Sequence, residues 1–183
     1  MILIINGFGG STEYMRDFAT PLKPVMIVSL LHGVSLAQEC SRINAIIERD
    51  SPTAIIAFST GCIVACSCDL PTGCRLHGAL VNEPRPDELA RIVFARSITD
   101  LLTTLQTCLL EPGVKPMIDV VKSGRCRVDV LVGETDPYRH VAHALCDAGV
   151  SVKLHRIAGG DHHMLYHMPS ECAERVKIIL GGW

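Results

Sequence analysis

Four short stretches of the chain combine glycine with side chains that can react or carry charge. They read NGFGGS from residue 6, FSTG from residue 58, GETDPY from residue 133 and GGDHH from residue 159. A serine hydroxyl, a histidine and a carboxylate can together perform nucleophilic acyl transfer, because the histidine takes the serine proton and the carboxylate orients the histidine. The sequence therefore contains the group types for this chemistry, at widely separated positions.

Ser59 is the candidate nucleophile. It follows AIIAF, which has the character of a buried strand, and precedes TGCIVAC, which can open a helix. A serine exposed on such a turn needs small residues two positions before and after it, because the chain turns there under strain. Ala57 and Gly61 meet this need. The alternative is a polar residue where a strand ends, since serine followed by a nearby glycine is a common pattern.

The glycines that follow Asn6 let the backbone turn tightly and point an amide N–H into a cleft. In an acyl-transfer site, the N–H groups of Phe8 and Thr60 would form the oxyanion hole, which binds the negative oxygen of the tetrahedral intermediate. A phosphate-binding loop is the alternative, but the G-x-G-x-x-G pattern is missing. A plain tight turn is another.

Asp136 and His162 are the candidate acid and base. Asp136 ends the run VDVLVGETD, and His162 follows a glycine turn after VKLHRI. His163 competes for the role of base, because a shift of one residue in the turn exchanges the two histidines. Glu134 and Asp161 compete for the role of acid. Glu134 lies closer to the predicted strand, and Asp161 is too near His162 in sequence to reach its far nitrogen easily.

Metal or disulfide chemistry is a weaker interpretation of the sequence. His163 and His167 are four residues apart, as metal ligands on a helix face can be, but no matching carboxylate or cysteine pattern accompanies them. We therefore expect neither a metal nor another cofactor. The nine cysteines include no C-x-x-C pair, and we expect reduced thiols that pack like small hydrophobic side chains. Cys62 and Cys66 are expected on one helix face, against the sheet.

Alternating strands and helices must position the four loops. Continuous apolar runs predict strands at residues 2–5, 25–31, 54–58, 78–81, 128–132 and 150–157. Helical spacing falls between and after them, at residues 12–20, 35–49, 60–68, 86–122, 139–148 and 170–180. This alternation predicts a parallel sheet between two layers of helices, a three-layer α/β/α fold. In such folds ligands bind beyond the carboxyl ends of the strands, where all four loops fall.

Length and charge limit the class of protein. The 183 residues suit one domain, 1–183, and the net charge of -2 with both signs scattered speaks against nucleic acid as a partner. No apolar run approaches the roughly 20 residues of a membrane span, and the short apolar start lacks the features of a signal peptide. We therefore expect a cytoplasmic protein. The block at 86–122, broken by prolines, predicts a small helical cap with an apolar inner face beside the site.

With these residues identified, the chain resembles the α/β-hydrolase superfamily. The similarity runs from MILIINGFGGS through AFSTG and VLVGETD to GGDHHML, and the order Ser59, Asp136, His162 is that of its nucleophile, acid and base. In size the chain is most similar to small serine hydrolases and esterases that lack the first two strands of the full fold. The histidine loop resembles that of thioesterases. Asn6 stands where many members have histidine, and Ala57 replaces a glycine.

The resemblance implies a mostly parallel six-stranded sheet and a serine hydrolase that cleaves a carboxylic ester or thioester through an acyl-enzyme. Ser59, His162 and Asp136 would form the triad, and the substrate would be a small acyl compound. The stretch LLHG, with His32, is a rival oxyanion loop, but it leaves too short a chain before Ser59 for the usual intervening elements. From another class, the alternative is a non-catalytic module of the same fold that binds a ligand or a protein.

Overall fold

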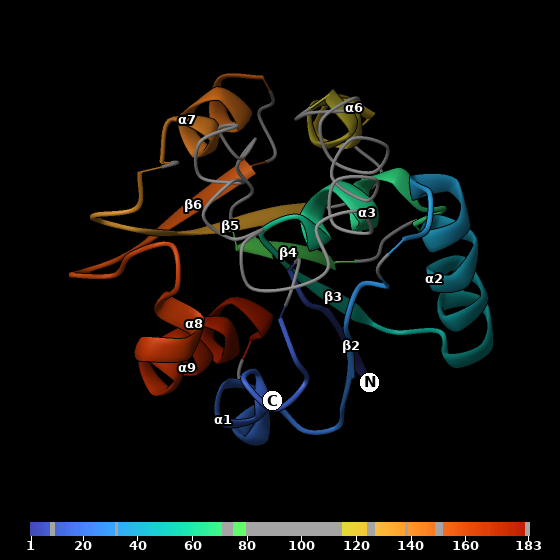
Figure 1. Cartoon of the computed structure of the whole chain (residues 1–183). Helices are drawn as coiled ribbons and strands as arrows, with labels where there is room; N and C mark the ends of the chain where they lie inside the picture. Colours follow the sequence, from blue (N-terminus) through green and yellow to red (C-terminus); the bar gives the residue numbers. More distant parts are fainter. Residues whose placement is uncertain are drawn as a thin grey trace.

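A six-stranded parallel sheet forms the centre of the protein (Figure 1). The structure is a computed structural model, and it describes residues 1–7, 10–31, 33–70, 75–79, 115–123, 127–137, 139–148 and 152–181. The strands are β1 (Ile2–Ile5), β2 (Val25–Val28), β3 (Ala54–Phe58), β4 (Arg75–Ala79), β5 (Arg127–Gly133) and β6 (Val152–Ile157). Their order across the sheet is β2-β1-β3-β4-β5-β6, and every neighbouring pair is parallel. The carboxyl ends of all six strands therefore lie along one edge.

Helices cover both faces of the sheet (Figure 1). In chain order they are α1 (Arg16–Ala19), the 3-10 helix η1 (Thr20–Leu22), α2 (Leu36–Asp50), α3 (Gly61–Ser67), α6 (Lys115–Ser123), α7 (Arg139–Ala148), α8 (Met164–His167) and α9 (Pro169–Leu180). The helices α2, α3, α6 and α7 lie on one face, and α1, α8 and α9 lie on the other. The predicted α/β fold with a parallel sheet between helical layers is confirmed.

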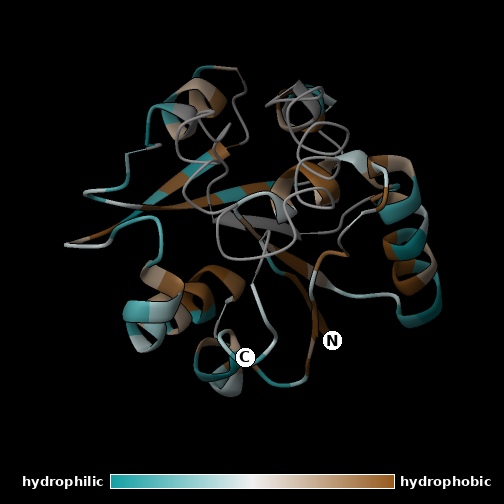
Figure 2. Ribbon diagram, viewed as in Figure 1, coloured by the Kyte–Doolittle hydropathy of each residue, from teal (hydrophilic) through white to brown (hydrophobic). Residues whose placement is uncertain are grey.

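The strands β1, β3 and β5 each contribute to two separate cores. Leu3 and Ile5 belong to the core under α2, α3, α6 and α7, whereas Ile2 and Ile4 belong to the core under α1 and α9. All four side chains are buried. A strand that is covered on both faces needs apolar residues at every position, which explains why these runs are continuous rather than alternating. In Figure 2, β1 and β3 are brown along their length, whereas α2 carries both teal and brown residues.

Some element boundaries differ from the prediction. The fourth strand begins at Arg75, where it pairs with Ala54 of β3, and not at residue 78. Arg75 and His77 interrupt the apolar pattern that was used to place it. The second strand ends at Val28 and not at residue 31, because the Ser29 carbonyl and the Leu31 N–H bond instead to side chains of α2. The helix α8 was not expected as a separate element.

Part of the predicted cap belongs to the main body of the protein. Lys115–Ser123 forms α6, which packs beside α3 and α7, and Met117 is buried in the core beneath them. A proline in the first turn suits a helix start, so Pro116 opens this helix. The rest of the predicted cap, residues 86–114, lies outside the described residues. Within the described part, no helix has the length and hydrophobicity needed to cross a bilayer.

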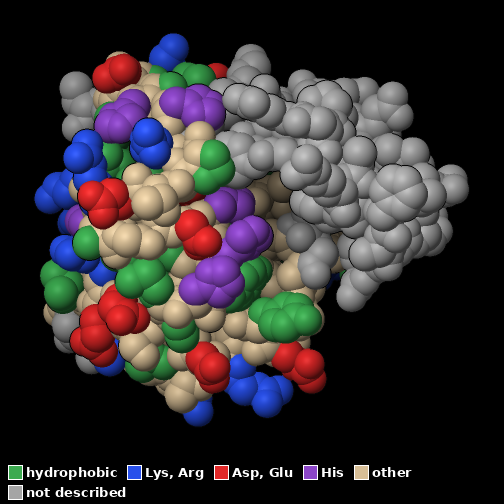
Figure 3. Space-filling model, turned by 60° about the vertical axis from the view of Figure 1, so that its left-hand side comes forward, with side chains coloured by type: hydrophobic (Ala, Val, Ile, Leu, Met, Phe, Trp, Pro, Cys, Tyr) green, Lys and Arg blue, Asp and Glu red, His purple; other side chains and the backbone are tan. Residues whose placement is uncertain are grey.

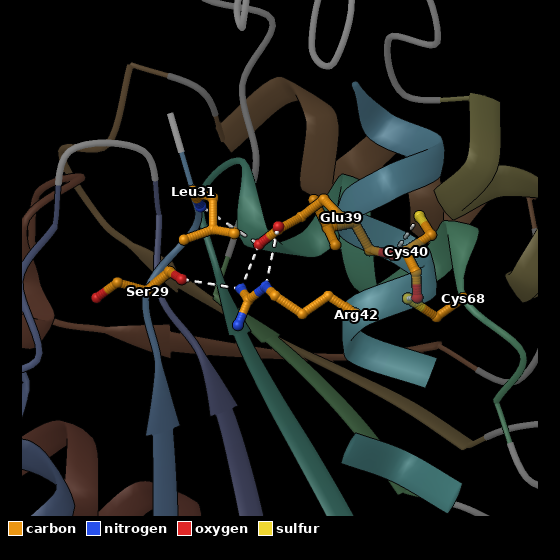
Figure 4. Close-up of polar contacts among 7 residues, drawn as sticks. Ser29, Leu31, Glu39, Cys40, Arg42 and Cys68 are labelled. Carbon is orange, nitrogen blue, oxygen red and sulfur yellow. Dashed lines mark hydrogen bonds and ion pairs between the residues drawn. The ribbon is translucent and has the colours of Figure 1, made fainter. Parts of the chain in front are cut away.

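The loop after β2 is fastened to α2 by a buried ion pair (Figure 4). The Glu39 carboxylate, 3% exposed, accepts from the Arg42 guanidinium and from the backbone N–H of Leu31 at 3.4 Å. Arg42 also donates to the carbonyl oxygen of Ser29 at 3.0 Å. Because the guanidinium and a backbone amide both contact it, the buried carboxylate is compensated. The same contacts hold Leu31 close to α2.

The buried cysteines pack as expected for small hydrophobic side chains. Cys40, Cys62, Cys68 and Cys172 all lie in the two cores. Their thiols donate to backbone carbonyls: Cys62 to Ala57 at 3.2 Å and Cys68 to the carbonyl of Cys40 at 3.8 Å. Burial raises the pKa of the Cys62 thiol, and raises that of Cys172 to about 12. These thiols therefore stay protonated near neutral pH and are poor nucleophiles.

Candidate active site

The four loops singled out in the sequence follow β1, β3, β5 and β6, so all four begin at the same edge of the sheet. This is the edge where ligands bind in parallel α/β folds. Figure 3 shows the face of the protein on this side, with histidine side chains gathered near its centre.

Ser59 lies on a strained turn between β3 and α3. Its φ is 51°, in the left-handed region that non-glycine residues rarely occupy. The backbone N–H of Cys62 donates to the Ser59 carbonyl at 2.9 Å, which closes the turn. A Cβ on Gly61 would lie 2.5 Å from the Ile5 carbonyl oxygen, so only glycine lets α3 start this close to the end of β1. The serine is therefore presented on a sharp strand-to-helix turn, as its small neighbours predicted.

Two contacts of His162 join three separate loops. Its Nε2 lies 3.2 Å from Ser59 Oγ, and its Nδ1 lies 3.3 Å from Asp136 Oδ2. Asp136 is 2% exposed and the His162 side chain 14%. With the proton on Nδ1, the ring donates to Asp136 and accepts from the Ser59 hydroxyl. The structure thus brings together the three side chains that the sequence singled out, with His162 between Ser59 and Asp136.

Close backbone packing holds the turn after β5 against the turn after β6. A Cβ on Gly133 would lie 2.3 Å from the Gly160 carbonyl oxygen, so glycine is required there. The same oxygen accepts from both the N–H and the hydroxyl of Thr135, at 2.9 and 2.8 Å. The N–H of Glu134 donates to the Ile157 carbonyl at 3.0 Å. Asp136 and His162 are therefore carried on two turns that contact each other directly.

The two rival carboxylates make contacts away from His162. Glu134 is exposed, and its Oε2 accepts from the N–H of Gly159 at 3.0 Å. Asp161 accepts from the N–H of His163 at 2.8 Å, and its other oxygen lies 3.5 Å from His167 Nδ1. Each therefore stabilises the turn after β6 locally, and the carboxylate that His162 contacts is Asp136.

His163 lies beside the site and does not replace His162. Its ring stacks on Tyr166, with centroids 6.1 Å apart, and its centroid is 5.4 Å from that of His162. Partial burial, and then the neighbouring His162, lower the pKa of His163 below its ordinary value. His163 and His167 do face each other, at 6.2 Å between centroids. Among the described residues, however, no group of three His, Cys, Asp or Glu side chains is placed to hold a metal ion.

The loop after β1 begins directly against Ser59. A Cβ on Gly7 would lie 3.0 Å from Ser59 Cβ, and the N–H of Gly10 donates to the Gly7 carbonyl at 3.2 Å. The predicted oxyanion donor Phe8 lies outside the described residues. The other predicted donor, Thr60, is buried and follows Ser59 in the chain. His32 of the rival loop also lies outside the described residues.

Sequence reasoning missed two residues that surround the site. Phe58 contacts His162 with ring centroids 5.6 Å apart, and Tyr166 packs edge-on against Phe58 at 5.3 Å. The Tyr166 hydroxyl donates to Asn6 Oδ1 at 3.1 Å. Phe58 was read only as the last residue of a strand. For Tyr166, the spacing of three residues from His163, at the start of α8, was an available signal, since residues three apart share a helix face.

Comparison with known proteins concerns the whole chain and not the site alone. No family model and no curated protein matches this sequence. Solved structures do match: MenH from S. aureus aligns over 98% of this chain and 93% of that one, at 12% identity and a TM-score of 0.76. The α/β-hydrolase MGS-M2, from a Medee basin deep-sea metagenome library, aligns over 100% and 90%, at 13% identity and 0.76.

A thioesterase domain from the curacin biosynthetic pathway aligns over 96% of this chain and 89% of that one, at 12% identity and a TM-score of 0.66. Likeness at such low identity concerns the path of the backbone and not the chemistry. It establishes that the chain has the α/β-hydrolase fold, and the resemblance expected from the sequence is confirmed at this level.

Proposed function

We propose that the protein is a serine hydrolase that cleaves a carboxylic ester or thioester through a triad of Ser59, His162 and Asp136. The observation that supports this most is the pair of His162 contacts, at 3.2 Å to the serine oxygen and 3.3 Å to the carboxylate. Three side chains from three separate loops meet in the order that the reaction requires. The strained φ of Ser59 supports the same conclusion, because strain of this kind gathers at functional sites.

The reaction proceeds through a covalent acyl-enzyme. His162 Nε2 takes the proton from Ser59 Oγ as that oxygen attacks the acyl carbonyl, and the backbone N–H groups of Phe8 and Thr60 stabilise the oxyanion. His162 then protonates the leaving alcohol or thiol. A water molecule, deprotonated by His162, attacks the acyl-enzyme, and His162 returns the proton to Ser59 Oγ as the acid is released. Asp136 holds the imidazole in the tautomer with the proton on Nδ1 and stabilises its positive charge. No cofactor takes part in these steps.

The substrate class follows from the surroundings of the serine. Phe58 lines one side of His162, and the apolar segments of residues 86–114 would supply a cap for an acyl chain. Among the similar structures are carboxylesterases of Nitrososphaera gargenis and the curacin thioesterase domain. We therefore propose a small acyl ester or thioester as substrate, and the two are told apart by comparing kcat/KM for 4-nitrophenyl acetate and for short acyl-thioesters.

Labelling with a fluorophosphonate tests the nucleophile without knowledge of the natural substrate. The wild-type protein should gain one adduct at Ser59, and Ser59→Ala should gain none. Ser67→Ala is a matched control, since the Ser67 hydroxyl donates to the Ile63 carbonyl within α3 at 2.7 Å, and it should label normally. His162→Gln should label far more slowly than the wild type.

Two results would contradict the proposal. An adduct that persists in Ser59→Ala would mean that another residue is the nucleophile. A folded wild-type protein that neither labels nor hydrolyses simple esters would favour the rival from another class, a module of the same fold that binds a ligand or a protein without turnover.

A further inference from the structure

Asn6 is a buried amide whose two ends contact three different groups. Its side chain is 0% exposed. The Oδ1 atom accepts from the Gly7 N–H at 2.8 Å and from the Tyr166 hydroxyl at 3.1 Å, while Nδ2 donates to the Ser11 carbonyl at 3.0 Å. A buried amide with satisfied ends specifies one arrangement of its partners, because losing any contact leaves a polar atom without compensation.

These contacts fold the loop after β1 around the asparagine side chain. A Cβ on Gly10 would lie 2.5 Å from Asn6 Nδ2, so the returning part of the loop passes directly over the amide. The start of the loop is fixed against the nucleophile, because a Cβ on Gly7 would lie 3.0 Å from Ser59 Cβ. The position of the Asn6 side chain therefore sets where Gly7 lies beside Ser59 and where the chain returns at Gly10.

Tyr166 brings this amide into contact with the histidine segment. The Tyr166 N–H donates to the His163 carbonyl at 2.8 Å, so the tyrosine follows the turn that carries His162. Its ring is enclosed by Phe58, His163 and Tyr14, with centroids 5.3 to 6.1 Å away. Burial raises the pKa of the Tyr166 phenol to about 12, so the hydroxyl remains a neutral donor to the amide oxygen near neutral pH.

We propose that Tyr166 is a positioning residue: through Asn6, its hydroxyl fixes Gly7 against Ser59 and so aligns the serine with the segment that carries His162. The inference rests on the proposed serine hydrolase function. The hydroxyl acts through the Asn6 amide and not on the reacting atoms. Because proton transfer from Ser59 to His162 begins only as the serine attacks, misalignment of these two residues lowers kcat and leaves ground-state binding unchanged.

Tyr166→Phe tests the link, because it removes one oxygen and keeps the packed ring. The hydrogen bond is of ordinary neutral strength, so kcat for 4-nitrophenyl acetate should fall roughly 2- to 12-fold with KM unchanged. A trifluoromethyl ketone, which forms an oxyanion on the serine, should bind more weakly by the same factor. The pH profile of kcat/KM should keep its shape, because His162 and Asp136 are untouched.

Tyr14→Phe is the matched control, because Tyr14 is the neighbouring tyrosine, is 66% exposed and loses the same atom. Its kinetics should equal those of the wild type. Asn6→Ala tests whether the Tyr166 hydroxyl acts through the asparagine. Once the Asn6 amide oxygen is gone, adding Tyr166→Phe to Asn6→Ala should cause no further loss of kcat. Thermal denaturation of each variant separates a loss of fold from a loss of alignment.

Four kinetic results would overturn the inference: wild-type kcat in Tyr166→Phe, a raised KM at unchanged kcat, a shifted pH profile, or fully additive losses in the double variant. Failure of the proposed function is recognised separately, by a wild-type protein that takes up no fluorophosphonate. In that case amide hydrogen exchange of residues 1–15 tests whether the Tyr166 hydroxyl holds the loop after β1 through Asn6. Faster exchange in Tyr166→Phe supports it, and unchanged exchange overturns it.

Discussion

Gly133→Ala should disable catalysis without touching any reacting group. The added Cβ would lie 2.3 Å from the Gly160 carbonyl oxygen, whereas real contacts of this kind are essentially never under 3.0 Å. Both atoms belong to backbone, so no side-chain rotation relieves the clash. The Gly160 carbonyl must retreat, and it is the acceptor of both Thr135 hydrogen bonds. The turn that carries His162 therefore moves away from the turn that carries Asp136.

The size of the effect follows from that displacement. Overpacking of this kind costs about 1–3 kcal/mol of stability. A shift approaching 1 Å between catalytic groups costs on the order of 10²-fold in rate, and we expect kcat to fall by this factor. Steady-state hydrolysis of 4-nitrophenyl acetate measures kcat, and urea denaturation measures the stability.

Gly159→Ala provides the control within the same turn. Gly159 has φ +67° and no atom within 4 Å of an added Cβ, so alanine there brings backbone strain without a clash. It should lose about 1 kcal/mol of stability and keep its kcat. Gly160→Ala, with neighbours at 3.2 Å, should be intermediate and serves if Gly133→Ala does not fold. A folded Gly133→Ala with kcat within threefold of Gly159→Ala would refute the reasoning.

Three further predictions concern single side chains. Asp136→Asn should lower kcat by roughly 10⁴-fold through the wrong histidine tautomer, whereas Glu134→Gln and Asp161→Asn should cost far less; equal losses in steady-state kinetics would mean that the acid is misassigned. Ser59→Gly should be more stable to urea than Ser59→Ala by about 1 kcal/mol, since glycine relieves the left-handed φ; equal stability would argue against strain. His163→Gln should retain most activity. Because the pKa of His163 is lowered in the folded state, the unfolded chain binds a proton at this residue more readily than the folded chain does. Wild-type stability should therefore fall as the pH drops through the ordinary histidine pKa of about 6.5. This loss of stability at acidic pH should be smaller in His163→Gln when urea midpoints are compared at neutral and mildly acidic pH. An unchanged loss would contradict a lowered pKa of His163 in the folded protein.

The loops of the site could be predicted because each follows a continuous apolar run. In a parallel sheet, such runs end at one edge, so Ser59, Asp136 and His162 had to lie along the same side of the protein. Local chemistry then separated some rivals. Asp161 is adjacent to His162, and the structure shows it bonded within its own turn, as that closeness suggested.

The link between Asn6 and Tyr166 could not be predicted, because it joins positions 160 residues apart and depends on the depth of two side chains. Asn6 was read only as a substitute for histidine. The register between strands could not be predicted either. Arg75 belongs to β4 because it pairs with Ala54 and Arg127. Polar residues inside a strand weaken the apolar signal, so the prediction started this strand too late.

The contact between Ser59 and His162 spans 103 residues, and it has a consequence for how the protein reaches its native state. β1 pairs with β3, and the turn after β6 supplies His162, so the pairings that build the site are non-local. Folds dominated by such pairings form slowly, because long stretches of chain must be ordered before the contacts are made. During refolding, recovery of hydrolysis should therefore trail the recovery of helical circular dichroism, and a nascent chain brings Ser59 and His162 together only after β6 has been added to the sheet.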